Sequence, residues 1–360
     1  MINSHLYTLI MAGGHGTRFW PESTRAKPKQ YLSLVGDHSL LYQTLARFEG
    51  MVAVERRFLV TTKDQASLAI SSGAELFKKS NLILEPAGRN TAPCILLSLV
   101  ELLEKGAQDE DVVAIVPSDH IILNTKGFQE TLRVAFENAV SQEKIVTVGI
   151  KPHFPHTGYG YIHRGDETRS EVFKVQSFKE KPDRHIAEDY VASGEYYWNA
   201  GMFVSRIDVL LQEFATHAPE VFSFFSELKE ALTDRSRLAE VYQKIDKDSI
   251  DYAVMEKSSK ILVVPAQFDW NDLGSWDALE GLCETRAGNN TLVRARELFT
   301  EDAKGNIVFA PDKFVALVGV DDLVIALNKD SLLVMKKSQS QKVKSVVEFL
   351  SGESKLKDLV

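Results

Sequence analysis

A glycine-rich, basic segment near the N-terminus has the side chains needed to hold phosphate groups. The stretch MAGGHGTRFWPESTRAKPKQY, residues 11–31, includes three glycines and two basic residues that we single out, Gly13, Gly14, Gly16, Arg18 and Lys29. Glycines allow consecutive backbone N–H groups to converge on phosphate oxygens, because no Cβ blocks the approach. The arginine and the lysine add positive charge that amides lack. These residue types at this spacing predict a cradle for a nucleoside triphosphate.

This segment matches neither of two common glycine-rich phosphate motifs. No Gly-Lys-Ser/Thr follows the glycines, which excludes a Walker A loop, and the third glycine of the dinucleotide fingerprint is missing. The missing fingerprint also disfavours a Rossmann dehydrogenase. A plain surface loop is the structural alternative, but the arginine, the Trp20-Pro21 pair and the run Pro28-Lys29-Gln30 count against it.

An aspartate further along the chain could bind a metal ion. Asp119 lies in the segment PSDH and follows an apolar run over residues 111–116. A carboxylate at the end of a buried strand can hold Mg²⁺ against phosphate oxygens. It could equally cap a helix. We assign no general-base role to His120, because a histidine beside an acidic loop is more often a hydrogen-bonding neighbour.

Two other polar segments have both a structural and a binding interpretation. In EPAGRNTAP, Asn90 or Thr91 could simply cap the apolar helix predicted over residues 94–103. Glu180 and Lys181, taken alone, would form a surface ion pair. Their position beside a proline in an apolar strand context makes that interpretation less satisfactory.

The chain resembles the sugar-1-phosphate nucleotidylyltransferases in at least six segments that occur in the family's order. Along the chain these include GGHGTRFWPESTRAKPKQY, EPAGRNTAP, PSDH, GYGYI, FKEKP, NAGMF, SIDYAVME and DWNDLGSW. The joint match extends over almost the whole chain and is far more specific than any single motif. It implies an enzyme that transfers GMP from GTP to mannose 1-phosphate and that uses Mg²⁺ or another divalent cation.

The resemblance also assigns roles to individual residues. It implies that the catalytic residues are Arg18, Lys29, Asp119 and Asp272. Nucleotide binding is implied for Gly13, Gly14, Gly16, Glu85, Arg89, Asn90, Thr91 and Ser118. Sugar-phosphate binding is implied for Gly160, Glu180, Lys181 and Asn199, a set that can accept from sugar hydroxyls and meet the phosphate. The implied metal ligands are Asp119 and Asp272, with Asp269 as the nearby alternative to Asp272. In SIDYAVME we expect a mainly structural role, with Asp251 as a candidate site residue of no assigned function.

The composition limits the classes of protein that fit. A net charge of −8 argues against general binding to nucleic acid or to anionic membranes. The two cysteines, Cys94 and Cys283, lack the neighbouring ligands of a zinc cluster. No basic region precedes the first apolar run, and no window reaches the ~20 apolar residues of a membrane span. We therefore expect a cytoplasmic enzyme that binds neither nucleic acid nor membrane.

The strands and helices that position these residues are indicated by short apolar runs that alternate with segments of helical pattern. Strands are predicted at residues 6–10, 57–62, 81–85, 111–116, 144–150 and 261–265. Such alternation implies an α/β fold in which helices cover both faces of a sheet and ligands lie at the carboxyl ends of strands. The resemblance implies a Rossmann-like, GT-A-like nucleotidyltransferase fold with a mixed sheet.

The pattern changes beyond Gly288, where apolar runs become short and polar breaks become frequent. We predict a catalytic domain over residues 1–287 and a small C-terminal domain over residues 288–360 that carries no catalytic residues. An amphipathic helix is predicted over residues 341–350. The resemblance implies that this domain is a left-handed β-helix-like fragment used for subunit contacts, and we expect a homodimer.

Two other functions fit the same fold. One is a guanylyltransferase for another sugar 1-phosphate, such as a heptose. The other is a non-catalytic regulatory subunit that binds a nucleotide sugar. The presence of Lys29, Asp119 and Asp272 disfavours the second, because a protein without catalysis has no need of all three.

Overall fold

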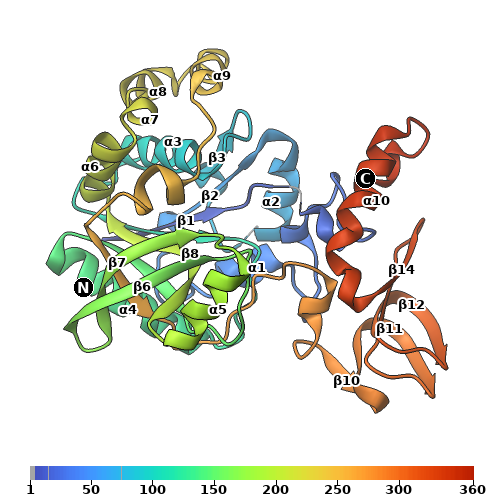
Figure 1. The fold of residues 1–360 in the computed structure, drawn as a ribbon. Coiled ribbons are helices and arrows are strands. Elements are labelled where there is room, and N and C mark those ends of the chain that lie inside the picture. The colour runs from blue at the N-terminus through green and yellow to red at the C-terminus, as the bar shows by residue number, and fades with distance from the viewer. Residues whose placement is uncertain (1–4, 15, 74) are drawn as a thin grey trace.

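The computed structural model describes residues 5–14, 16–73 and 75–360 (Figure 1). The strands of its larger sheet are β1 (Leu6–Met11), β2 (Arg57–Thr62), β3 (Leu82–Glu85), β4 (Val112–Pro117), β5 (Ile145–Ile150), β6 (Gly160–Arg169), β7 (Val172–Glu180), β8 (Tyr196–Arg206) and β9 (Ile261–Pro265). Within these described residues they form a nine-stranded sheet in the order β3-β2-β1-β4-β8-β5-β9-β7-β6.

Strand directions in this sheet are mixed. β1 runs parallel to β2 and to β4, and β2 runs parallel to β3. β8 is antiparallel to both β4 and β5, whereas β9 is parallel to β5. The predicted mixed α/β sheet is therefore confirmed. Because β1, β4 and β9 all point the same way, the segments that follow them leave from one edge of the sheet.

Helices cover both faces of the sheet. They are α1 (Leu40–Ala46), α2 (Ala66–Gly73), α3 (Thr91–Glu104), α4 (Thr125–Gln142), α5 (Arg184–Ser193), α6 (Ile207–His217), α7 (Pro219–Phe222), α8 (Phe225–Ala231) and α9 (Arg235–Lys244). Alternate strand residues face opposite layers, so Tyr7 and Leu9 of β1 pack with α3 and α6 to α9. Leu6 and Ile10 pack with α1, α2, α4 and α5. Figure 1 shows α6 to α9 gathered on the side of α3.

The elements predicted around the glycine-rich segment form as expected. The apolar runs of β1 and β4 are almost entirely buried, as strands covered on both faces must be. Helix α1 follows the glycine-rich segment, and the Ser39 hydroxyl caps it by accepting from the Tyr42 N–H at 3.2 Å. Among the described residues, no helix combines the length and the apolar character that crossing a bilayer requires.

A smaller sheet follows, with β10 (Glu284–Arg286), β11 (Asn290–Glu301), β12 (Ile307–Val318), β13 (Leu323–Leu327) and β14 (Leu332–Lys336) in sequential order. β11, β12 and β13 are parallel, and the outer strands are antiparallel to their neighbours. The apolar residues of β12 form two runs separated by residues 311–313, but the strand is continuous across this break. The predicted closing helix is α10 (Val343–Gly352). The division at residue 287 stays a prediction; β10, just before it, pairs with β11.

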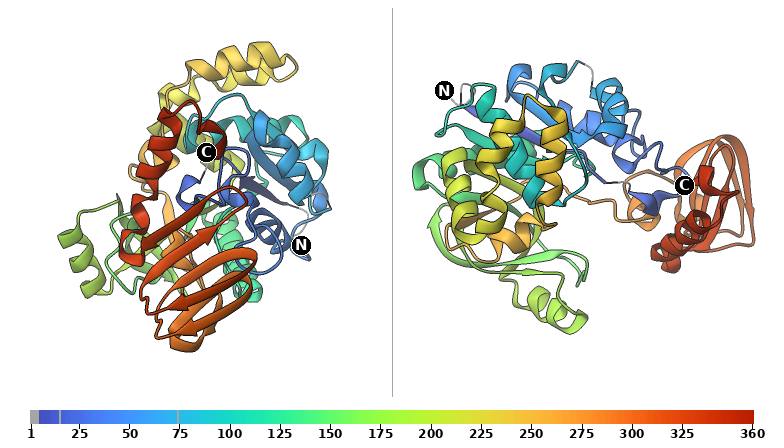
Figure 2. Two further views of the ribbon diagram at one scale, coloured as in Figure 1. Left: turned by 90° about the vertical axis from the view of Figure 1, so that its right-hand side faces the viewer. Right: turned by 90° about the horizontal axis from the view of Figure 1, so that it is seen from above.

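The C-terminal residues share a hydrophobic cluster with the glycine-rich segment. Phe19 packs against Trp276 with ring centroids 5.2 Å apart, and Trp276 packs against Phe309 of β12 at 5.3 Å. The Trp276 indole donates to the Trp20 carbonyl at 3.0 Å, and the Trp20 indole donates to the Leu359 carbonyl at 2.8 Å. Figure 2 shows the smaller sheet at one end of the molecule. The packing nevertheless ties that end to the loop predicted to bind phosphate.

Candidate active site

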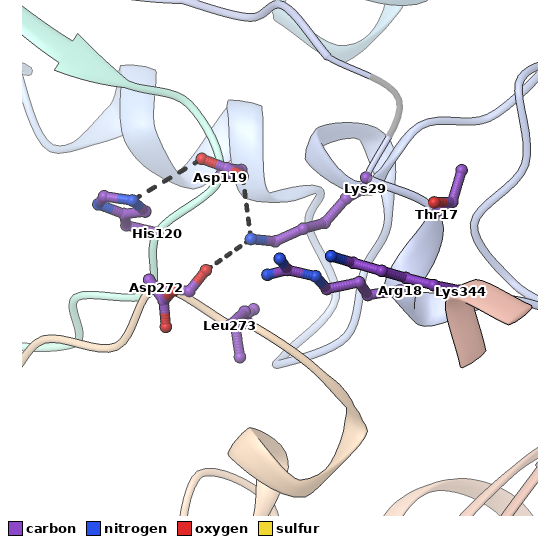
Figure 3. Close-up of a pocket in the computed structure, with 10 residues that line it drawn as sticks. Thr17, Arg18, Lys29, Asp119, His120, Asp272, Leu273 and Lys344 are labelled. Carbon is purple, nitrogen blue, oxygen red and sulfur yellow. Dashed lines mark hydrogen bonds and ion pairs between the residues drawn. The ribbon is translucent and has the colours of Figure 1, made fainter. Parts of the chain in front are cut away.

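A cavity of about 340 Å³ lies where the segments after β1, β4 and β9 meet. Its lining residues are Gly16, Thr17, Arg18, Lys29, Asp119, His120, Asp272, Leu273, Gly274 and Lys344 (Figure 3). The four residues predicted to be catalytic, Arg18, Lys29, Asp119 and Asp272, all line it. Three separate segments therefore bring opposite charges to one small space, as a site for a charged ligand requires.

The glycine-rich segment is held in shape by close backbone packing. Gly16 has a φ of 53°, and a Cβ there would lie 2.4 Å from the Cβ of Lys29. Gly14 has a φ of 93°, which also favours glycine. The Gln30 amide donates to the carbonyl oxygens of Ala12 and Gly14 at 3.3 and 3.2 Å. Gly13 has no positive φ and open space beside it, so the conformational reason given for glycine applies to only two of the three.

Lys29 links the two predicted metal ligands. The residue is only 7% exposed, and its Nζ donates to Asp119 Oδ2 at 2.9 Å and to the backbone carbonyl of Asp272 at 2.5 Å. The ammonium thus occupies a fixed position between the segments that follow β4 and β9. A buried cation with its direction set by two acceptors is a preorganised group, able to stabilise charge that develops on a phosphate.

The electrostatics around Asp119 favour its charged form. Burial raises the pKa of the Asp119 carboxyl, but the positive charge of Lys29 and the hydrogen bond from it, together with His120, outweigh this and leave the pKa below its usual value. Burial lowers the pKa of His120. The Trp270 indole donates to His120 Nδ1 at 3.1 Å, so the neutral ring carries its proton on Nε2. His120 is a hydrogen-bonding neighbour, as expected.

Asp272 is oriented by a tyrosine that we did not select from the sequence. The Tyr159 hydroxyl donates to Asp272 Oδ1 at 2.6 Å. Burial and the charge of Asp272 raise the pKa of Tyr159, so this hydroxyl stays a donor. Its ring packs on His156, Trp198 and Trp270, with centroids 3.8, 5.1 and 5.3 Å away. Tyr159 lies within GYGYI, a segment noted for its glycines, and its aromatic contacts explain its fixed position.

Asp269, the alternative ligand to Asp272, has a structural role. Its two carboxylate oxygens accept from the backbone N–H groups of Leu123 and Asn124 at 2.8 and 2.7 Å. It caps the chain before α4 and is not part of the cavity lining. This arrangement favours Asp272 over Asp269.

The carboxylates of Asp119 and Asp272 fit a divalent cation that is completed by substrate. Mg²⁺ in phosphate sites takes one or two carboxylates and fills its remaining positions with phosphate oxygens and waters. Both carboxylates line one cavity, and no ion pair or hydrogen bond of the described residues uses Asp272 Oδ2. Within the described part of the chain, no group of three or more His, Cys, Asp or Glu side chains is arranged to hold a metal alone.

The segment EPAGRNTAP, which contains four of the predicted nucleotide-binding residues, lies at the same edge of the sheet, at the end of β3, but outside this cavity. Glu85 is buried and accepts from the Tyr242 hydroxyl at 2.7 Å and from the Arg89 N–H at 3.1 Å, and burial raises its pKa. Arg89 also donates to the Gln243 carbonyl. The Thr91 hydroxyl accepts from the Ile250 N–H at 2.8 Å. These side chains brace the segment against the end of α9 and the residues that follow it.

Two further predicted nucleotide-binding residues have structural contacts. Asn90 has a φ of 68°, and its side chain accepts from the Thr91 N–H at 2.9 Å at the start of α3. The capping interpretation therefore holds for Asn90. Ser118 is buried, and its carbonyl accepts from the Thr44 hydroxyl at 3.3 Å. Their predicted contacts with nucleotide stay predictions.

The predicted sugar-phosphate residues form a second polar cluster beside the cavity. Gly160 of β6 lies opposite Glu180 of β7, and a Cβ at Gly160 would lie 2.5 Å from a Glu180 carboxylate oxygen. Lys181 forms an ion pair with Glu180. The Asn199 amide donates to Asp251 Oδ1 at 2.9 Å. Because Tyr159 and Gly160 are consecutive, this cluster adjoins the Asp272 side of the cavity.

Lys344 is a charged cavity residue that was not predicted from the sequence. It lies on α10, in the C-terminal stretch for which no catalytic residues are predicted, and the structure brings it to the cavity lining. No local motif surrounds it. The amphipathic pattern of residues 341–350 indicates a helix that packs through its apolar face. It does not indicate which residues its polar face contacts.

Comparisons with known proteins match nearly the whole chain. A family described as "Nucleotidyl transferase" matches residues 7–286, and one described as "MannoseP isomerase/GMP-like beta-helix domain" matches residues 298–350. A Klebsiella pneumoniae protein named mannose-1-phosphate guanylyltransferase is 38% identical over 353 residues, which are 96% of this chain and 74% of that protein. A protein of the same name from Escherichia coli strain K12 is 36% identical over 365 residues, covering 99% of this chain and 75% of its own length. A crystal structure from Thermus thermophilus, described as a mannose-1-phosphate geranyltransferase, has a TM-score of 0.87 and 34% identity and covers 96% of this chain and 99% of that one.

Proposed function

The chain belongs to the nucleotidyl transferase family, and we propose that it transfers GMP from GTP to α-D-mannose 1-phosphate, giving GDP-mannose and diphosphate. The names of the Klebsiella pneumoniae and Escherichia coli relatives support this pair of substrates. The observation that carries the proposal is the convergence of Arg18, Lys29, Asp119 and Asp272 on one cavity at the carboxyl edge of the sheet.

The reaction that these residues suit is a direct displacement at the α-phosphorus. An oxygen of the sugar phosphate forms the new P–O bond, the bond to the diphosphate breaks, and the electron pair leaves with the diphosphate. Such a transfer depends on positioning and charge neutralisation and needs no protein nucleophile. Lys29, fixed between Asp119 and Asp272, would meet the phosphate at the reacting centre, and Arg18 would hold the phosphates beside it.

Asp119 and Asp272 would hold a divalent cation, which neutralises charge on the phosphate oxygens when bound. Two observations support that role. The pKa of Asp119 lies below its usual value, so it is an anion at neutral pH, and the Tyr159 hydroxyl fixes the orientation of Asp272.

Guanine and mannose preferences are the finer parts of the proposal. A site that hydrogen-bonds the polar edge of one base leaves groups unpaired when it meets another, so ATP should be a poor substrate. The experiment is to measure diphosphate release across a grid of nucleoside triphosphates and sugar 1-phosphates, with and without a chelator. We expect diphosphate release to be most efficient with GTP and mannose 1-phosphate, and we expect the chelator to abolish this activity. Equal efficiency of ATP and GTP would overturn the guanine preference, and full activity in chelator would overturn the role of the divalent cation.

We further propose that the protein is a homodimer joined through its smaller sheet. Phe299 of β11 lies opposite Ala316 of β12. Because side chains two residues apart on a strand point to the same face, Phe299, Phe314 and Val318 share one face of the sheet. They are 48%, 62% and 60% exposed, which leaves an apolar surface uncovered in one copy. A second copy of the same face would cover it. Light scattering should give twice the mass of one chain, and Phe314→Glu should yield monomers; a monomeric wild-type protein would contradict this.

A further inference from the structure

The cavity receives a third cation from the C-terminal domain. Lys344 of α10 lines it together with Arg18 and Lys29. Figure 3 shows the Lys344 side chain extending from α10 with its ammonium end directed toward the cavity. Among the described residues neither the Lys344 nor the Arg18 side chain forms an ion pair or a hydrogen bond, whereas Lys29 is paired with Asp119. The cavity is therefore lined by three cations and two carboxylates, and two of the cations are not paired within the protein.

Packing fixes the position from which Lys344 reaches the cavity. The preceding residue, Val343, is 1% exposed and belongs to the hydrophobic cluster that includes Phe19. Just before α10 begins, the Gln341 amide donates to the Ser275 hydroxyl at 3.0 Å, in the segment that follows Asp272. The start of α10 is thus anchored to both sides of the cavity. A lysine held by its helix in this way loses less conformational freedom on binding than one on a free surface.

The arrangement of charges indicates which part of a ligand meets Lys344. Lys29 is buried between Asp119 and Asp272, which marks the inner side of the cavity as the reacting centre. Lys344 is exposed and enters beside Arg18 and Thr17, on the side of the cavity away from His120 (Figure 3). A triphosphate that places its α-phosphate near Lys29 would extend its outer phosphates toward Arg18 and Lys344.

We propose that Lys344 binds the β- and γ-phosphates of the nucleoside triphosphate, and therefore the diphosphate that leaves. This inference rests on the proposed nucleotidyl transfer and adds that the C-terminal domain completes the phosphate site. In the reaction, Lys344 would neutralise charge that builds up on the departing diphosphate, which is the product with the highest charge density. The domain predicted to serve only packing and subunit contacts then has a direct part in binding.

The test compares Lys344→Ala with Lys344→Arg and with Lys342→Ala. Lys342 is exposed, two residues away, and absent from the cavity lining, so it is a matched control for the loss of one positive charge. Binding of GTP, GMP and inorganic diphosphate is measured by calorimetry, and thermal unfolding checks the fold. We expect Lys344→Ala to weaken GTP and diphosphate binding about tenfold or more, because a charge-assisted contact is lost. GMP binding should change little, Lys344→Arg should retain most of the affinity, and Lys342→Ala should match the wild type.

The binding measurements separate this inference from the proposed function. Unchanged GTP and diphosphate affinities in folded Lys344→Ala would overturn the role of Lys344, even if the enzyme is active. An equal loss for GMP and diphosphate would overturn the assignment to the outer phosphates. Failure of the wild type to release diphosphate from any triphosphate would instead overturn the proposed reaction, because diphosphate binding does not depend on turnover. If Lys344→Ala unfolds, Lys344→Gln, which keeps a long side chain, provides the same comparison.

Discussion

The Lys29 ammonium contacts the backbone of Asp272, donating a hydrogen bond to the Asp272 carbonyl oxygen at 2.5 Å. The carboxylate of Asp272 therefore forms no ion pair with this lysine. It accepts a hydrogen bond from the Tyr159 hydroxyl instead. One residue thus positions the cation through its main chain while its side chain stays available to a metal ion. Asp119 differs, since its carboxylate binds Lys29 directly. The two carboxylates have the same charge but different tasks.

The first prediction concerns the two cations of the glycine-rich segment. Lys29→Ala and Arg18→Ala should each lower turnover by roughly 10² or more, because removal of one preorganised charge contact commonly costs ~3 kcal/mol of transition-state stabilisation. Steady-state kinetics with GTP and mannose 1-phosphate measure the effect. Lys27→Ala is a suitable control, since Lys27 is an exposed residue of the same segment that pairs with Glu22. Near-normal turnover in folded Lys29→Ala would remove the lysine from the mechanism.

A second prediction concerns the hydroxyl that orients Asp272. Tyr159→Phe keeps the ring and its contacts with His156, Trp198 and Trp270 but removes the donor at 2.6 Å. We expect turnover to fall about tenfold and the divalent-cation concentration needed for half-maximal activity to rise, because outer contacts of metal ligands typically affect affinity roughly 10–100-fold.

Tyr161→Phe is the control for this change. Tyr161 lies two residues away, and its hydroxyl donates to the His156 carbonyl at 3.0 Å without contacting Asp272. It should leave the cation dependence as in the wild type. A Tyr159→Phe enzyme with an unchanged cation requirement would show that the hydroxyl does not position the carboxylate.

The sequence was informative where the chemistry is local. Gly16, Lys29 and Asp119 were identified because a glycine-rich segment and a strand end carry their own signals, and buried strands read as continuous apolar runs. Tyr159 was missed because its partner Asp272 is 113 residues away, and nothing around either residue indicates the pairing. Lys344 was missed for the same reason, since only the return of α10 to Phe19 brings it to the cavity.

The sequence also left the C-terminal strands incomplete. β11 begins with two buried residues, but from Arg294 onward its residues are half-buried or exposed and rich in charge, with the run RARE near its centre, so no long apolar run marks it. Its partner β12 begins with four buried residues and is half-buried or exposed after them except at Leu317, so the sequence of this one strand resembles two short ones. Pairing between neighbouring strands decides their extent here, and that information is not local.

A third prediction is a pH dependence caused by Asp251. Burial and the charge of Glu180 raise the pKa of Asp251 to about 6, above the ~3.9 of an unfolded chain. Between these two values the native state binds more protons than the unfolded state, so the contribution of Asp251 to the free energy of unfolding falls as pH rises through this window. Asp251→Asn removes the titration and keeps an oxygen that can accept from Asn199.

The measurement is urea unfolding of the wild type and Asp251→Asn at pH 4, 5, 6 and 7. We expect the variant to gain stability relative to the wild type as pH rises, reaching about 1–2 kcal/mol at pH 7 and nearly vanishing at pH 4. Asp166→Asn, at an exposed carboxylate on β6, should show no such trend. A stability difference that stays constant across the range would contradict the raised pKa.

The last prediction concerns removal of the C-terminal domain. A chain that ends at residue 287 would lose Phe309, Val343 and their neighbours, which cover Phe19 and Trp276 in a shared cluster. The truncation would expose these two aromatic side chains and remove the hydrogen bond from the Trp20 indole to the Leu359 carbonyl. Both changes should loosen the loop that carries Arg18. We expect the truncated protein to aggregate or to unfold at a lower temperature, and to lose activity by more than Lys344→Ala alone, because the loop loses its support and the cavity loses its third cation. Size-exclusion chromatography, thermal unfolding and turnover of the two variants make the comparison. A truncated protein that stays monodisperse and as active as Lys344→Ala would show that the domain supplies the lysine and does not support the loop.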